Sequence, residues 1–136
     1  MGDKPKKVYG YEVREPSFME SSYFLDNPHV SGMATEDGRI ILNQQSKLDN
    51  KQKQSVLQNE AARLFLKQSN IVPDFDITDE QRNLFIGTEY ERPENELYLK
   101  HTILGRIISN DPSAGKVTDQ QRKWAEWLLS ELKKRK

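Results

Sequence analysis

The sequence predicts an α+β fold that is mainly α, with an N-terminal extended region and a β-hairpin followed by about four helices. Three observations support this prediction. A segment rich in β-formers, residues 39–43, follows a turn signal at residues 37–38 and precedes a polar loop. Apolar side chains recur at helical spacing within residues 50–67. Two later segments, residues 78–81 and 118–121, carry the same helix-start pattern of a threonine followed three residues later by glutamine.

The N-terminal part combines β-formers with a dense group of apolar side chains. Residues 8–14 are expected to form a short strand or an extended segment. Residues 17–25 contain Phe18, Met19, Tyr23 and Phe24, and we expect this segment, as one or two helical turns, to dock onto the core. Residues 30–34 and 39–43 flank the turn and are expected to pair as a hairpin.

The rest of the chain is predicted to be helical. Asp49 or Asn50 caps the longest helix, which presents Leu57, Ala61, Leu64 and Phe65 on one face. A short helix is expected from Thr78 to about residue 86, with Gly87 as its C-cap. The helix at 94–109 has an apolar stripe too wide for a surface helix, so it is expected to be central or at an interface. We expect Phe65 and Ile103 to lie in the main core. The last helix, ending near residue 132, carries Trp124, Trp127, Leu128 and Leu132 on one face.

Length and charge indicate the organisation of the chain. Its 136 residues fit a single domain, residues 1–136, with a basic N-terminal arm at 1–7 and a basic C-terminal end at 133–136. The formal net charge is zero, yet residues 72–98 hold eight acidic and two basic side chains, whereas residues 99–136 hold nine basic and four acidic. This asymmetry suits head-to-tail packing of copies or contact with a charged neighbour; the alternative is that both regions are simply solvated. No apolar run is long enough to span a membrane, so no membrane partner is expected.

The segment Asn59-Glu60-Ala61-Ala62-Arg63 follows a predicted strand and turn, a layout similar to that of zincins. In the H-E-x-x-H motif of those hydrolases two imidazoles hold zinc and the glutamate is the base. Here Asn59 and Arg63 stand at the two ligand positions; an amide is a poor zinc ligand and a guanidinium repels the ion. We therefore expect no metal, no cofactor and no catalytic residues, and interpret Glu60 and Arg63 as an inward polar pair three residues apart on the helix.

Other candidate motifs are incomplete. His29 and His101 have no second nitrogen ligand nearby in sequence, and His101 is expected to pack within its helix. Residues 113–118 lack the first glycine and the magnesium-binding hydroxyl of a phosphate loop. The basic ends lack a recognisable reading helix or stacking platform, so nucleic acid is an unlikely partner.

Two stretches of the chain resemble small uncharacterised proteins of tailed bacteriophages. One runs from GMATEDGRIILN at residues 32–43 to NEAAR at 59–63; the other is HTILGRIISNDPSAG at 101–115 with TDQQ at 118–121. The resemblance implies a phage origin, and with it a location in the virion or the host cytoplasm. It carries over no catalytic residue.

These observations lead to a ranking of functions. The leading expectation is a non-enzymatic bacteriophage protein that acts through protein–protein contacts, as a structural or accessory component of the virion. The alternatives are an early phage protein that binds and inhibits a host enzyme, and a degenerate zincin-like domain. The expected partners are further copies of the chain or a larger phage assembly, and the candidate interface residues are Leu99, Ile103, Gly105, Ile107, Trp124 and Trp127. Gly105 costs about 1 kcal/mol relative to alanine in an exposed helix, which a close neighbouring backbone would explain.

Overall fold

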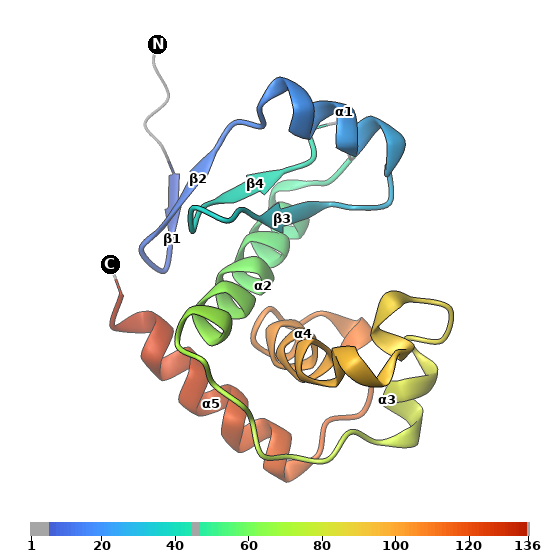
Figure 1. Cartoon of the computed structure of the whole chain (residues 1–136). Coiled ribbons are helices and arrows are strands. Elements are labelled where there is room, and N and C mark those ends of the chain that lie inside the picture. Colours follow the sequence, from blue (N-terminus) through green and yellow to red (C-terminus); the bar gives the residue numbers. More distant parts are fainter. Residues whose placement is uncertain (1–5, 45–46, 136) are drawn as a thin grey trace.

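A computed structural model describes residues 6–44 and 47–135. It is α+β and mainly α, as the sequence predicts (Figure 1). The strands are β1 (Lys6–Val8), β2 (Tyr11–Arg14), β3 (Gly32–Ala34) and β4 (Ile40–Leu42). The helices are α1 (Phe18–Asp26), α2 (Asn50–Gln68), α3 (Asp79–Asn83), α4 (Glu96–Ile108) and α5 (Asp119–Lys133), with the short 3₁₀ turns η1 (Glu89–Glu91), η2 (Pro93–Asn95) and η3 (Pro112–Ala114).

The four strands form one sheet in the order β1-β2-β4-β3. The predicted hairpin is confirmed, because β3 and β4 pair antiparallel with Met33 opposite Ile41. The segment expected to be a single extended stretch is instead a second hairpin, β1–β2, joined by Tyr9 and Gly10. Both turn residues have positive φ, 51° and 82°, which is the backbone of the two-residue turns that tight hairpins favour. Strands β2 and β4 then pair in parallel and join the two hairpins.

The pleat of the strands divides the sheet into two faces. Val13 lies opposite Ile40 and both face the main core, whereas their neighbours Arg14 and Ile41 lie opposite each other and point to the other face. In Figure 1 the sheet lies between α1 above and α2 below. Ile40 and Ile41 are both fully buried, so each face of β4 is covered.

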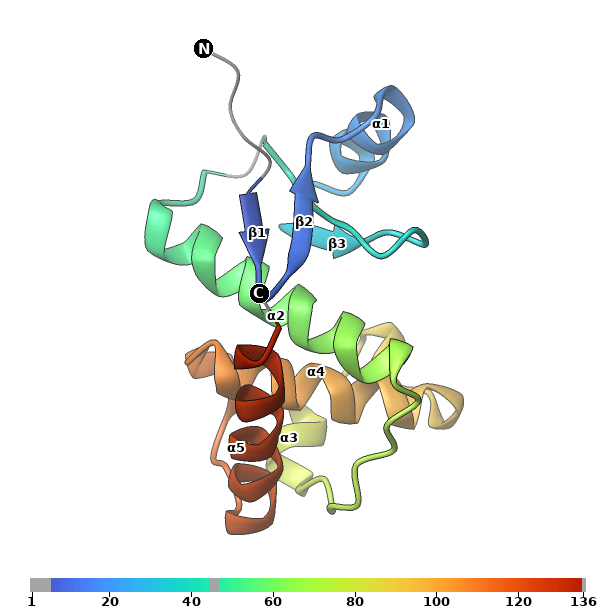
Figure 2. The same cartoon turned by 90° about the vertical axis from the view of Figure 1, so that its left-hand side faces the viewer.

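Helix α2 is the centre of the molecule. Asp49 caps it, as predicted, by accepting a hydrogen bond from the backbone of Gln52 at 2.7 Å. One side of α2 packs on the sheet and another on α4 and α5 (Figure 2). Its buried side chains therefore spread around the helix, and Leu66 is fully buried while Phe65 is only partly buried. The prediction that Phe65 lies in the main core is wrong to that extent: it lies at the edge of the core, 6.5 Å from Trp127 between ring centroids.

The later helices follow the sequence predictions closely. Helix α4 is central, and the prediction of a buried Ile103 is confirmed at 1% exposure. Both capping boxes form, since the hydroxyls of Thr78 and Thr118 each accept from the backbone three residues on at 3.1 Å. Helix α3 ends earlier than expected, at Asn83, and turns carry the chain to Gly87.

The two basic ends predicted from the sequence, residues 1–7 and 133–136, each lie partly within the described fold. Lys6 and Lys7 belong to β1, while the remainder of the predicted basic arm, residues 1–5, lies outside the described residues. At the other end, the Nε of Arg135 donates to the backbone carbonyl of Tyr9 at 3.0 Å. The guanidinium of Arg135 also lies 4.0 Å from the ring centroid of Tyr11. Arg135 is therefore engaged within the fold; Lys136 lies outside the described residues.

Candidate functional site

The outward face of α1 is the most apolar exposed helix face among the described residues. Its side chains are exposed to 89% at Phe18, 80% at Met19, 61% at Leu25 and 45% at Tyr23. The prediction that this segment docks its apolar group onto the core is therefore wrong, apart from Phe24 at 2% exposure. The reason is helical spacing. Phe24 shares a face with Glu20 and Ser21, and the other apolar side chains point the opposite way.

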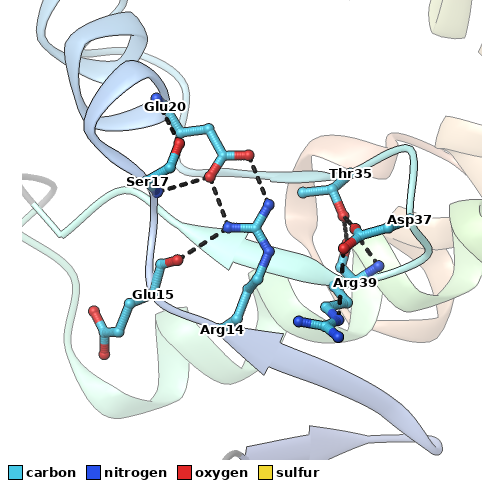
Figure 3. Close-up of polar contacts among 7 residues, drawn as sticks. All are labelled: Arg14, Glu15, Ser17, Glu20, Thr35, Asp37 and Arg39. Carbon is cyan, nitrogen blue, oxygen red and sulfur yellow. Dashed lines mark hydrogen bonds and ion pairs between the residues drawn. The ribbon is translucent and has the colours of Figure 1, made fainter.

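Helix α1 is held in place by a charged pair at its base. Both Nη atoms of Arg14, on β2, donate to the two carboxylate oxygens of Glu20 at 2.7 Å (Figure 3). Glu20 also accepts from the backbone of Ser17 at 2.8 Å, and the Ser17 hydroxyl accepts from the backbone of Glu20 at 3.2 Å. Because the guanidinium and these donors stabilise the carboxylate, the pKa of Glu20 falls from 4.5 to about 2. The parallel pairing of charged groups fixes the orientation of α1 on the sheet.

A second polar cluster rigidifies the turn of the β3–β4 hairpin beside this pair. The hydroxyl of Thr35 contacts Asp37 and accepts from the backbone of Arg39 at 3.1 Å (Figure 3). Arg39 in turn pairs with Glu12 at 3.3 Å and Asp37 at 3.6 Å. On the sheet face towards α1, these ion pairs accompany the buried Ile41, whereas the face towards α2 packs on the apolar core.

The segment from Val8 to Gln44, which contains α1, carries a net negative charge. Residues 8–44 contain six acidic side chains and two basic ones. Both of the basic side chains, Arg14 and Arg39, are paired within the segment. Exposed carboxylates remain at Glu15, Asp26 and Glu36, of which Asp26 is the last residue of α1. Glu15, just before the helix cap, and Asp26, at the helix end, therefore place carboxylates at the two ends of α1.

Of the predicted inward pair Glu60 and Arg63, only Glu60 is buried; Arg63 is partly exposed. The carboxylate of Glu60 is buried, lies 3.3 Å from Nη1 of Arg63 and also accepts from the backbone of Ala34. Burial raises the pKa of Glu60, and Arg63 opposes that shift. Arg63 instead reaches towards the surface, where its Nη2 donates to the hydroxyl of Tyr90 at 2.8 Å. It lines a small open pocket together with Glu89, Tyr90, Asn95 and Tyr98.

The zincin-like segment is occupied by packing contacts. Residues 59–63 lie within α2, where Asn59 faces α4 and Ala61 and Ala62 are fully buried. Within residues 6–44 and 47–135, no group of three or more His, Asp or Glu side chains is placed to hold a metal ion. His101 packs within α4, as expected, with Nε2 2.9 Å from the carbonyl of Ile71 and a pKa lowered by burial. That the segment binds no zinc stays a prediction.

The interface residues predicted from sequence fall into two groups. Leu99, Ile103 and Gly105 are buried inside the chain, so the prediction that they form a contact surface is wrong for this fold. A Cβ built on Gly105 would overlap Oδ1 of Asn59 and lie 3.2 Å from its carbonyl oxygen. The close backbone that Gly105 accommodates is therefore the chain's own α2. Ile107 and Trp124 are half-buried, and Trp127 is 38% exposed.

Sequence reasoning missed the outward face of α1 because it treated every apolar side chain of the segment as core. Two signals could have found it. Ser17 and Glu20 have the spacing of a capping box, which places the start of the helix. From that start, Phe18, Ser22 and Leu25 fall on one strip and Phe24 on the opposite side.

No helix among the described residues is both long and apolar enough to cross a membrane.

Comparisons of the chain with models of known families, with curated proteins and with solved structures find no match. The two stretches that carry the phage resemblance are packed against each other, since Asn59 lies against Gly105. Each stretch contributes buried residues to the core, such as Ile40 and Ile103. Helix α1 lies outside both stretches.

Proposed function

We propose that this chain is a non-enzymatic bacteriophage protein that acts through protein–protein contacts, as a component of the particle. The observation that carries the contact role is the outward apolar face of α1, and the phage assignment rests on the resemblance of residues 32–63 and 101–121. From their exposed fractions, Phe18, Met19, Tyr23 and Leu25 expose on the order of 500 Å², within the range of the largest patch on a typical monomer, which is often functional.

The placement of this face suits binding. Helix α1 is fixed by the Arg14–Glu20 pair and anchored by Phe24, so its outward side chains are presented on a defined backbone. A pre-ordered surface loses less conformational freedom on association than a flexible one. The polar pocket around Arg63 is a weaker candidate for a binding site, because Arg63 already pairs with Glu60 and donates a hydrogen bond to Tyr90.

The test is incorporation into phage particles. Two variants are compared with the unaltered chain: Phe18→Ser with Leu25→Ser, on α1, and a matched control, Val72→Ser with Ile86→Ser. The control residues are exposed to 66% each and lie outside α1, in the segments that follow α2 and α3. We expect mass spectrometry of purified particles to find the unaltered chain and the control in fixed copy number, and the α1 variant to be folded but absent.

Other outcomes would contradict the proposal. Absence of the unaltered chain from particles, together with co-purification of one host enzyme, would support the inhibitor alternative. Metal-dependent hydrolysis that a chelator abolishes would support the zincin-like alternative. Equal incorporation of the α1 variant would show that another surface makes the contact.

A further inference from the structure

We propose that Asp37–Gly38 is the site at which this chain spontaneously forms isoaspartate, and that the polar cluster of the β3–β4 turn slows that reaction. Aspartate followed by glycine is especially prone to isomerise, because glycine has no side chain to hinder its backbone nitrogen. The sequence contains this single Asp–Gly step and no Asn–Gly step. The side chain of Asp37 is 54% exposed, so water reaches it.

The reaction needs no reagent other than water. The backbone nitrogen of Gly38 attacks Cγ of Asp37 when the carboxyl group is protonated. A bond forms between the nitrogen and Cγ, and the amide proton leaves with the carboxyl hydroxyl as water, which closes a succinimide ring. Water then opens the ring. Opening at Cγ restores aspartate, whereas opening at the backbone carbonyl frees an α-carboxylate and leaves the chain running through the side chain, as isoaspartate.

Contacts within the turn protect the carbon that is attacked. The hydroxyl of Thr35 donates to the carboxylate of Asp37, and Nε of Arg39 lies 3.6 Å from that carboxylate (Figure 3). Both contacts favour the ionised form, and the pKa of Asp37 is lowered, chiefly by the hydrogen bond from Thr35. A carboxylate is a poorer electrophile than a carboxylic acid, because it lacks the hydroxyl that leaves as water.

The attacking nitrogen is also engaged. The backbone nitrogen of Gly38 donates to the carbonyl of Thr35 at 3.1 Å, and it must give up this bond to reach Cγ. Gly38 has a φ of 81° and packs against the end of α2, where a Cβ built on it would lie 2.9 Å from Nε2 of Gln68. Gln68 accepts in turn from the hydroxyl of Tyr11, on β2, at 3.1 Å. Rotation of the Asp37–Gly38 peptide, which the attack requires, is therefore restricted.

Isomerisation at this position would disturb the hairpin. Isoaspartate lengthens the backbone by one methylene group, within the turn that is closed by the 2.8 Å bond from the nitrogen of Thr35 to the carbonyl of Arg39. Next to that turn, Ala34 lies opposite Ile40, which is fully buried. Because the register of the hairpin decides which side chains of β4 are buried, the isomerised chain should unfold at a lower denaturant concentration.

The test is prolonged incubation of purified full-length protein at neutral pH, with one sample folded and one in denaturant. Peptide mass spectrometry locates the product, since endoproteinase Asp-N cleaves before aspartate and not before isoaspartate. We expect isoaspartate to form first at position 37 in both samples, and severalfold faster in denaturant, where the turn contacts are absent.

Two variants separate the polar cluster from the rest of the fold. Thr35→Val removes the hydroxyl at nearly constant shape, and Arg39→Gln removes the guanidinium. The matched control is Arg82→Gln, because Arg82 is 46% exposed against 47% for Arg39 and pairs with Glu96. Both turn variants, if they unfold at the same midpoint as the control, should isomerise severalfold faster than it does. Asp37→Glu should form no isoaspartate at this position.

Any of three results would overturn the inference. Equal rates in the folded and denatured samples would show that the fold gives no protection. Earlier isoaspartate formation at another aspartate would show that the site is misplaced. Rates in both turn variants no higher than in the Arg82→Gln control would show that the cluster is not the cause of the protection.

Discussion

Gln81 and Gln121 donate a side-chain hydrogen bond to each other in both directions, at 2.6 and 2.7 Å. Both side chains are fully buried, although the residues lie 40 positions apart. Each glutamine also completes a capping box, accepting from the backbone of Thr78 at 3.0 Å or of Thr118 at 3.2 Å. The start of α3 and the start of α5 are thus locked to one another.

Replacing Gln121 with Met should destabilise the fold by about 1–3 kcal/mol, because it leaves the buried amide of Gln81 without its partner. The reciprocal change, Gln81→Met, should have a similar effect. The double variant should lose less stability than the sum of the two, since it leaves no orphaned amide. Denaturant unfolding of the four proteins measures this coupling, with the exposed Gln120→Met as control; strict additivity would contradict the pairing.

Gly105→Leu should destabilise the monomer, by about 1–3 kcal/mol or more, because the side chain would be forced into the backbone of α2 at Asn59. The sequence-based prediction placed Gly105 at an interface with a partner, whereas the neighbouring backbone belongs to α2 of the same chain. Asn59→Ala is the matched control. It should be nearly neutral, since Oδ1 of Asn59 is buried without a hydrogen-bond partner. Thermal unfolding at low concentration checks both, and an unchanged midpoint for Gly105→Leu would refute the close packing.

Ile103→Ala should cost about 2–5 kcal/mol, as expected for a fully buried aliphatic side chain. Phe65→Ala should cost less than the about 3–5 kcal/mol of a buried phenylalanine, because Phe65 lies at the edge of the core. Chemical denaturation of the two variants gives the comparison. A larger loss for Phe65→Ala than for Ile103→Ala would show that the edge position is misjudged.

The Glu20→Gln variant should have a lower free energy of unfolding than the unaltered chain at neutral pH, and this difference should vanish in acid. The folded-state pKa of Glu20, about 2, lies below its ordinary value of 4.5. The contribution of the carboxylate is therefore present above about pH 4.5 and is lost as the pH falls towards 2. Unfolding measured across this window tests it. In an Arg14→Gln background the pH dependence of the difference should shrink, because Arg14 is the main cause of the shift.

Sequence patterns predicted the structural features that depend on residues close together in the chain. The caps at Asp49, Thr78 and Thr118 and the β3–β4 hairpin were all readable, because each involves groups within a few positions. The bond between Gln81 and Gln121 was not, since it joins two caps 40 residues apart. The parallel pairing of β2 with β4 escaped prediction for the same reason.

The candidate site was less predictable than the fold. Hydrophobicity marks Phe18 and Phe24 equally, and helical spacing places them on different faces of α1. The position of α1 on the sheet then decides which face is buried. The width of the α4 stripe indicated correctly that Leu99 and Ile103 are covered. It did not indicate what covers them, which is the chain's own α2 and α5 and not a partner.

The contacts of Arg135 with Tyr9 and Tyr11, which clamp the β1–β2 hairpin, also set an order of events during synthesis. Its bond to the carbonyl of Tyr9 spans 126 positions. While a ribosome is still translating the chain, the hairpin can pair its strands but has no guanidinium over Tyr11. The clamp closes only once α5 has left the exit tunnel, so the first strands made are among the last to be fastened. A nascent chain stalled before α5 should expose this hairpin to proteases, and the released protein should protect it.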